Sequence, residues 1–155
     1  MNRQEQLTAG FTDVLNKMTW LNAPKMKAAL EGVNSSEVHC IEYIGSHEDA
    51  NVTKLAQAFY QTRGGISKIT KKLVQKGIID SYQKPDNKKE IYFQLTAKGK
   101  ALYQTHEALH KEFSERDKTV FEEMTEEEFD IITKFVKKYC RHLDEEIAKQ
   151  DMQSL

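Results

Sequence analysis

The sequence predicts a mainly α-helical protein with one two-stranded β hairpin. Through most of the 155 residues, apolar side chains recur at three- and four-residue steps, which is the spacing of one helix face. Only residues 78–83 and 90–95 have strand character, and a turn sequence separates them. The second of these alternates, with Ile91, Phe93 and Leu95 on the inner face. The length suffices for one substantial core but is short for two independent domains.

The first predicted helix covers residues 3–21. Its apolar residues keep a helical period over five turns, and we expect Pro24 to end it. Asn34 stands three residues before a glutamate, a variant of the capping box that begins a second helix. In that helix, Ile41 and Ile44 should face the core.

Two short helices follow with almost no connection between them. We expect Thr53 to cap the first and Thr62 to cap the second, which Gly77 then ends. One face of the second helix is aliphatic, with Ile66, Ile69 and Leu73. The opposite face carries Lys68, Lys71, Lys72 and Gln75. Two helices joined so closely are typical of a helix-turn-helix unit.

The predicted hairpin is lysine-rich at its tip, where residues 84–89 read KPDNKK. A hairpin at this place makes the unit a winged helix. Between Lys54 and Lys89 the chain has nine Lys or Arg residues and two acids, a net charge of +7, whereas the whole chain has −1. This segregation favours a polyanion such as DNA as the partner. The alternative is an ordinary solvated helix and hairpin.

We expect three kinds of contact with DNA. Lys71 and Lys72 should lie against phosphates. The candidates for base contacts near the helix start are Thr62, Arg63, Gly65, Ser67 and Lys68. Gly64, with its glycine neighbour, removes side-chain bulk where backbone N–H groups would meet a phosphate. Lys89 and Lys88 should make the wing's contact with the minor groove.

Two long amphipathic helices are predicted after the hairpin. Thr96 caps one that runs to about Glu123, and Thr125 begins the other with a capping box. Residues 107–151 contain fourteen acids and eight Lys or Arg residues, a net charge of −6, so this end should not lie against DNA. The terminal helices carry more apolar surface than one small winged helix can cover. This predicts burial against a second copy.

The chain as a whole resembles the MarR family of bacterial winged-helix regulators. The residues that carry the resemblance are Leu55-Ala56, Ser67-Lys68, Leu73, Lys76-Gly77-Ile78-Ile79, Asp86-Asn87-Lys88-Lys89 and Leu95-Thr96-Ala97-Lys98-Gly99. The resemblance implies one MarR-like domain over residues 1–155. In it, residues 1–33 and 100–155 form dimerisation helices, and residues 34–99 form the winged-helix DNA-binding part.

The same resemblance implies a function. It is that of a dimeric, sequence-specific regulator, a repressor, which binds a pseudo-palindromic double-stranded operator. A small molecule or a metal would modulate its DNA affinity, and no cofactor is required. The wing departs from the family pattern, which has an aspartate and, two residues later, an arginine; this chain has Asn87 and Lys89. Lysine lacks the planar fork of arginine, so we expect weaker reading of the minor groove.

Three histidines form a candidate zinc site. In the zinc-sensing branch of the family, one histidine near the start of the second helix and a His-x-x-x-His pair after the wing bind zinc. His39, His106 and His110 stand at the matching positions. The carboxylate that this branch takes from its first helix has no counterpart, which leaves the fourth ligand open among Glu37, Glu42, Glu107, a water and an exogenous anion. Alternatively, the histidines are polar residues that line a pocket for an organic effector such as an aromatic acid.

The stretch His106-Glu107-Ala108-Leu109-His110 also matches the zinc-peptidase pattern, with Glu107 as general base. A third histidine does not follow at the metzincin spacing, where Arg116 stands. We therefore favour a regulator over a zinc hydrolase. No apolar run approaches the roughly 18 residues that cross a bilayer, and the N-terminus has no signal-peptide segment. We expect a cytoplasmic protein without a membrane partner.

Overall fold

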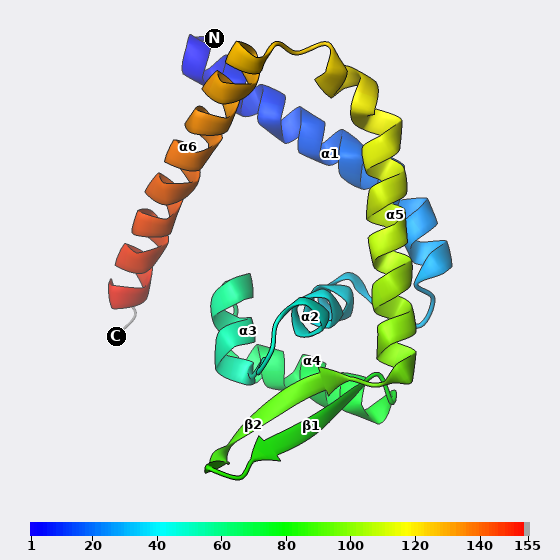
Figure 1. Cartoon of the computed structure of the whole chain (residues 1–155). Coiled ribbons are helices and arrows are strands. Elements are labelled where there is room, and N and C mark those ends of the chain that lie inside the picture. Colours follow the sequence, from blue (N-terminus) through cyan, green and yellow to red (C-terminus); the bar gives the residue numbers. More distant parts are fainter. Residues whose placement is uncertain (154–155) are drawn as a thin grey trace. The chain divides into compact units, whose positions relative to one another are not determined.

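The computed structural model describes residues 1–153, which form six helices and one antiparallel two-stranded sheet, as predicted (Figure 1). The elements are α1 (Arg3–Ala29), α2 (Ser35–Ser46), α3 (Val52–Phe59), α4 (Arg63–Gln75), β1 (Ile79–Lys84), β2 (Asn87–Leu95), α5 (Ala97–Glu122) and α6 (Glu126–Gln153). They divide into two compact units, Met1–Phe113 and Ser114–Leu155. Across the described part of the chain, none of the helices has the length and apolar character to cross a membrane.

The first helix, α1, is longer than predicted because Pro24 does not end it. The helix continues to Ala29 with the proline inside. A proline removes one helical hydrogen bond and commonly kinks the helix. The following residues 25–29, KMKAA, are good helix formers, and they carry the helix onward. None of the residues of α1 is buried in the single chain.

The second helix, α2, begins at the predicted capping box. Asn34 accepts a hydrogen bond from the Glu37 N–H, and the Glu37 carboxylate accepts one from the Asn34 N–H. Ile41 and Ile44 are buried, as predicted. The side chain of Glu37 is buried as well, and Lys76 Nζ donates to its two oxygens at 2.9 and 2.7 Å. This ion pair ties the start of α2 to the end of α4.

The next two helices, α3 and α4, form the predicted helix-turn-helix. Asn51, and not Thr53, caps α3, because its side chain accepts a first-turn N–H and Thr53 already lies inside the helix. Tyr60, in the left-handed conformation, ends α3. Thr62 caps α4 and Gly77, with φ +71°, follows its end, both as predicted.

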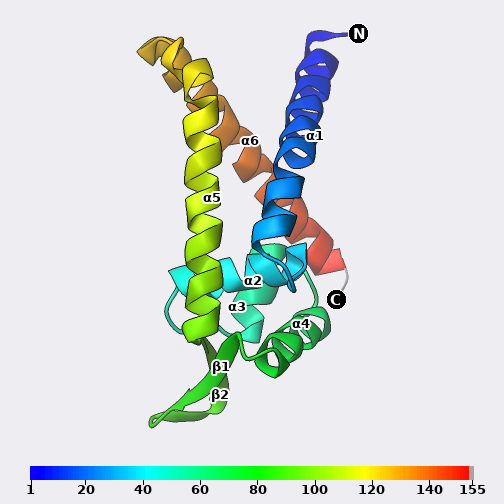
Figure 2. The same ribbon diagram turned by 90° about the vertical axis from the view of Figure 1, so that its right-hand side faces the viewer.

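The strands β1 and β2 form a hairpin that projects from this helical head (Figure 2). Both strands reach further than predicted, so only Pro85 and Asp86 remain between them. The lysine-rich residues 87–89 therefore belong to β2 and not to a loop. The pairing register shifts between the Tyr82–Tyr92 and Lys84–Asn87 pairs, so residues 88–91 of β2 lie opposite Gln83 alone and form a bulge in β2.

The faces of β2 differ in part from the predicted alternation. Phe93 is buried and Leu95 is half-buried, but Ile91 is 51% exposed. Tyr92, predicted on the outer face, is buried instead. Its ring centroid lies 5.5 Å from that of Tyr82, so a cross-strand aromatic pair covers it.

The main core lies in the head and includes Ile41, Ile44, Leu55, Ile66, Leu73, Ile78, Ile79 and Phe93. The start of α5 is bonded to the chain that leaves α4. Thr96 Oγ1 accepts from the Gly99 N–H at 3.1 Å, which caps α5 as predicted, and donates to the Gly77 carbonyl at 2.7 Å. A Cβ on Gly99 would lie 2.1 Å from the Ile78 carbonyl oxygen. The two backbones are therefore in direct contact.

The second unit contains the end of α5 and all of α6. Thr125 and Glu128 form the predicted capping box at the start of α6. Six residues of the apolar stripe of α6 are between 39% and 50% exposed in the single chain, and the seventh, Ile147, is half-buried; the six are Phe129, Ile132, Phe135, Val136, Tyr139 and Leu143.

Candidate nucleic-acid interface

The outer face of α4 carries exposed cations. Lys68, Lys71 and Lys72 are exposed, whereas Ile66 and Leu73 on the opposite face are buried. Helical spacing predicted this division, and the structure confirms it. The face is open to a partner along the length of the helix.

The first turn of α4 has little side-chain bulk. Thr62 Oγ1 accepts from the Gly65 N–H at 3.1 Å, while Gly64, Arg63 and Ser67 are exposed. A Cβ added to Gly64 would meet nothing within 4 Å. The first N–H groups of a helix lack helical partners and carry the positive end of its dipole. This turn is therefore open to an anion such as a phosphate.

Two of the three wing lysines are available to a partner. Lys88 and Lys89 are exposed on β2. Lys84, by contrast, is paired within the protein, with its Nζ 2.6 Å from Asp49 Oδ2 and 4.9 Å from the centroid of the Tyr92 ring. The sequence carries no local signal for the Asp49 contact, because 35 positions separate the two residues.

The cations of the candidate interface lack protein partners. Within residues 1–153, no ion pair or hydrogen bond engages the cationic groups of Arg63, Lys68, Lys71, Lys72, Lys88 or Lys89. Other lysines are paired, as Lys17 is with Asp13 and Lys149 with Glu146. Unpaired charge on an exposed face raises the local potential, which attracts a polyanion.

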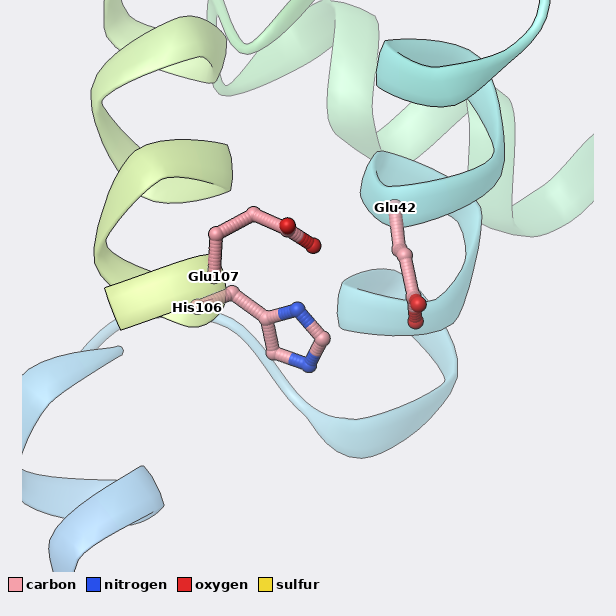
Figure 3. A group of neighbouring side chains, drawn as sticks. All are labelled: Glu42, His106 and Glu107. Atoms are coloured by element: carbon pink, nitrogen blue, oxygen red, sulfur yellow. The ribbon is translucent and has the colours of Figure 1, made fainter. Parts of the chain in front are cut away.

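A second cluster of polar side chains joins α2 and α5 (Figure 3). His106 is 5% exposed, and its Nε2 lies 3.0 Å from His110 Nε2. Glu42, His106 and Glu107 offer possible ligand atoms that all lie within 4.8 Å of one another. In Figure 3, Glu42 extends from α2 toward His106 and Glu107 on α5.

The chemistry of this cluster fits a metal. Among residues 1–153, His106 Nδ1 is buried without a hydrogen-bond partner, a costly arrangement that a ligand on this nitrogen would relieve, whereas an ion between the two Nε2 atoms would not. Burial, and then the nearby His110, lower the pKa of His106 below its ordinary value, so the neutral form that can coordinate is favoured. Two imidazole nitrogens on one tetrahedral zinc ion lie about 3.3 Å apart, close to the spacing of the His106–His110 pair.

The third predicted histidine lies outside this group. His39 is exposed, and its ring centroid is 5.8 Å from that of Phe59. Among the described residues, His39 is not part of a set of three or more candidate ligands within 4.8 Å. The structure thus brings together two of the three predicted histidines. It adds Glu42 and Glu107, which the sequence placed among the alternatives for the fourth ligand.

Comparisons with known proteins agree with the winged-helix geometry. The sequence model of the MarR family matches residues 33–91. The chain is similar to the HTH-type transcriptional regulator PchR of Bacillus subtilis (strain 168), with 34% identity over 113 residues, 73% of this chain and 67% of PchR. It is also similar to the uncharacterized HTH-type transcriptional regulator YhjH of that organism, with 31% identity over 137 residues, 83% of this chain and 75% of YhjH. Among solved structures, Streptococcus pneumoniae FabT in complex with DNA has a TM-score of 0.79 and 20% identity, over 92% of this chain and 98% of FabT.

Proposed function

The chain belongs to the MarR family, and on this premise we propose that it is a transcriptional regulator that binds double-stranded DNA as a homodimer. The observation that carries the proposal is the set of exposed, unpaired cations on α4 and β2 of a winged-helix head. The regulator would act as a repressor in the cytoplasm, without enzymatic activity. The DNA complex of FabT, a protein of the same fold, supports this use of the head.

In the proposed complex, α4 lies in the major groove. Its first residues contact base edges, namely Thr62, Arg63, Gly65, Ser67 and Lys68, while the backbone at Gly64 approaches a phosphate. Lys71 and Lys72 contact phosphates further along the helix. Lys88 and Lys89 on the wing contact the minor groove. These assignments rest on exposure, charge and position in the helix.

The homodimer would cover the apolar faces of the terminal helices. In α1, Leu7, Val14, Leu15 and Leu21 are each more than half exposed in the single chain, and the stripe of α6 is similarly open. Exposed apolar stripes of this length are costly in water and mark an interface. A two-fold dimer would place its two α4 helices in major grooves about 34 Å apart, which predicts a pseudo-palindromic operator.

The DNA proposal can be tested by the salt dependence of binding. The probe is a duplex that the wild-type protein selects from a random-sequence library. Replacing Lys71 and Lys72 by alanine should lower affinity and reduce the slope of log affinity against log salt by about two. Lys134→Ala with Lys137→Ala is the matched control, because both lysines are exposed on α6 in the acidic part of the chain. Equal slopes in the two double variants would refute the assignment of the α4 face.

For regulation, we propose that the cluster between α2 and α5 binds the effector. The residues whose ligand atoms converge for a zinc ion are Glu42, His106 and Glu107; His110 lies beside His106, and His39 remains the predicted further ligand. Bound zinc would supply a cross-link between the two helices. To change DNA affinity tenfold, binding need favour the competent conformation by only about 1.4 kcal/mol.

Calorimetric titration of zinc into metal-free protein tests the effector proposal, with DNA affinity measured in parallel. The His106→Ala, His110→Ala double variant should lose zinc binding. Glu42→Gln and His39→Ala compare the observed carboxylate with the predicted histidine. Zinc binding by the wild-type protein should weaken below about pH 6.5, because protonated imidazole cannot coordinate. Equal binding by wild type and double variant would exclude this metal site and leave an organic effector, such as an aromatic acid.

The peptidase alternative needs a separate assay. Zinc-loaded protein is incubated with an unstructured peptide, and Glu107→Gln serves as the control for the general base. We expect no turnover by either protein. Turnover that depends on Glu107 would favour the hydrolase.

A further inference from the structure

The connection between α2 and α3 has an unusual backbone. Asp49 adopts a left-handed conformation, with φ +56°, that residues other than glycine seldom occupy. Aspartate is among the residues that tolerate it, and such a conformation persists where surrounding contacts hold it. Asp49 lies two residues before Asn51, the N-cap of α3, so its contacts act beside the helix-turn-helix.

The Asp49 carboxylate holds two residues of β1. Tyr82 Oη donates to Oδ1 at 2.9 Å, and Lys84 Nζ donates to Oδ2 at 2.6 Å. These hydrogen bonds, from Lys84 and then Tyr82, keep the pKa of the Asp49 carboxyl below its ordinary value, so the group is ionised at neutral pH. Lys84 also lies against the ring of Tyr92 on β2. The Asp49–Lys84 pair thus contacts both strands of the wing.

The two β1 residues that Asp49 holds lie on either side of the bulge. The register shift falls between Tyr82 and Lys84. A bulge interrupts the ladder and bends the strand, and an isolated two-stranded hairpin is only marginally stable. Lys88 and Lys89 belong to the bulged segment 88–91 of β2, and Asp49 holds the β1 residues on both sides of this segment.

Ala50 and Asn51, the two residues after Asp49, also form hydrogen bonds with β2. The Phe93 N–H donates to the Ala50 carbonyl at 2.8 Å, and Asn51 Nδ2 donates to Glu90 Oε2 at 3.4 Å. Asn51 is also the N-cap of α3. Residues 49–51 thus connect the wing to the first helix of the helix-turn-helix pair.

We propose that Asp49 is a positioning residue that fixes the wing relative to α4 and so aims Lys88 and Lys89 at the minor groove. The proposal rests on the proposed function, because it concerns how the protein binds DNA. Without the Asp49 carboxylate, the bulged segment 88–91 and the tip of the hairpin would move relative to α3 and α4. The lysines would then contact DNA in only part of the ensemble.

The test uses the full-length protein and a duplex that the wild type selects from a random-sequence library. Asp49→Gly removes the carboxylate and keeps the left-handed backbone available. Asp49→Asn keeps an acceptor for Tyr82 and removes the charge. Asp80→Asn, on the exposed face of β1, is the control with the same change in net charge. Hydroxyl-radical footprinting measures protection of the minor groove at the flanks of the site, and titration measures DNA affinity.

Asp49→Gly should lose about tenfold in affinity and lose the flanking footprint, while the central protection by α4 remains. Adding Lys88→Ala and Lys89→Ala to this variant should cause little further loss, because the lysines no longer contact DNA. Asp49→Asn should fall between Asp49→Gly and the wild type, and Asp80→Asn should match the wild type. If Asp49→Gly does not fold, Asp49→Asn decides the question by the same footprint.

An unchanged flanking footprint in the folded Asp49 variants would overturn the positioning role. Full additivity of the Asp49 and lysine losses would overturn it as well. A wild-type protein that selects no duplex would instead refute the DNA-binding function, and with it this inference. The two failures are therefore distinguishable.

Discussion

Breaking the Glu37–Lys76 ion pair should have an asymmetric effect on stability. The Glu37 side chain is only 3% exposed, whereas that of Lys76 is 37% exposed. Lys76→Met leaves a carboxylate buried without its cation. Glu37→Gln leaves an ammonium group that water can reach. We therefore expect the lysine substitution to cost more than the glutamate substitution.

The exposure of each side chain sets the expected loss in the free energy of unfolding for each substitution. Removing one partner of a fully buried ion pair costs about 3–5 kcal/mol, whereas an exposed pair contributes about 0–1 kcal/mol. In Lys76→Met, the buried Glu37 keeps only its hydrogen bond from the Asn34 N–H, so we expect a loss of about 3 kcal/mol. In Glu37→Gln, Lys76 keeps the Gly32 carbonyl at 2.9 Å and gains water. Here we expect a loss of about 1 kcal/mol.

Urea unfolding followed by circular dichroism measures both losses. All variants must be compared at one protein concentration, because dimerisation contributes to apparent stability. The double variant Glu37→Gln, Lys76→Met completes a mutant cycle and isolates the coupling between the side chains. Equal losses in the two single variants, or a larger loss in Glu37→Gln, would show that unequal burial does not govern this pair.

Four further predictions concern other parts of the chain. Gly64→Ala should raise the free energy of unfolding by about 0.5–1 kcal/mol in urea titrations, because its Cβ meets nothing. The same variant should lose about tenfold in DNA affinity, because the added methyl group separates the backbone from a phosphate. Gly99→Ala should destabilise the protein by about 2–3 kcal/mol in the same assay, because its Cβ would overlap the Ile78 carbonyl. Val136→Glu should give a monomer in sedimentation at micromolar concentration, whereas Lys134→Glu on the other face of α6 should remain dimeric. The lowered pKa of His106 means that the unfolded chain takes up a proton first, so the free energy of unfolding should fall as the pH drops below 6.5. His106→Gln should lose this part of the pH dependence in urea unfolding at a series of pH values.

The sequence predicted the elements whose signals are local. The caps at Asn34, Thr62 and Thr125 rest on residues within three positions, and the structure contains all three. Pro24 misled the prediction because it was weighed without the helix formers that follow it. Thr53 was a plausible cap, but Asn51 precedes it and satisfies the same turn.

In the candidate sites, too, only the features with local signals were predictable from the sequence. Helical spacing alone places Lys68, Lys71 and Lys72 on one face of α4 and brings His106 next to His110. Contacts between segments that are far apart in the sequence could not be predicted from spacing. Neither Glu42 beside His106 nor Asp49 beside Lys84 follows from spacing, because the packing of separate elements brings these residues together.

The junction between the wing and α5 determines where the winged-helix part can be cut when it is exchanged between proteins. Three consecutive carbonyls after α4 accept hydrogen bonds from the start of α5: Lys76 from Lys98 Nζ at 3.0 Å, Gly77 from Thr96 Oγ1 at 2.7 Å, and Ile78 from the Thr96 N–H at 3.0 Å. A chimaera cut at Leu95, where the wing ends, would separate these donors from their acceptors. A winged-helix part that is moved to another protein should therefore end after Gly99. A graft that includes residues 96–99 keeps these hydrogen bonds, and so keeps the orientation of α4 relative to the start of α5.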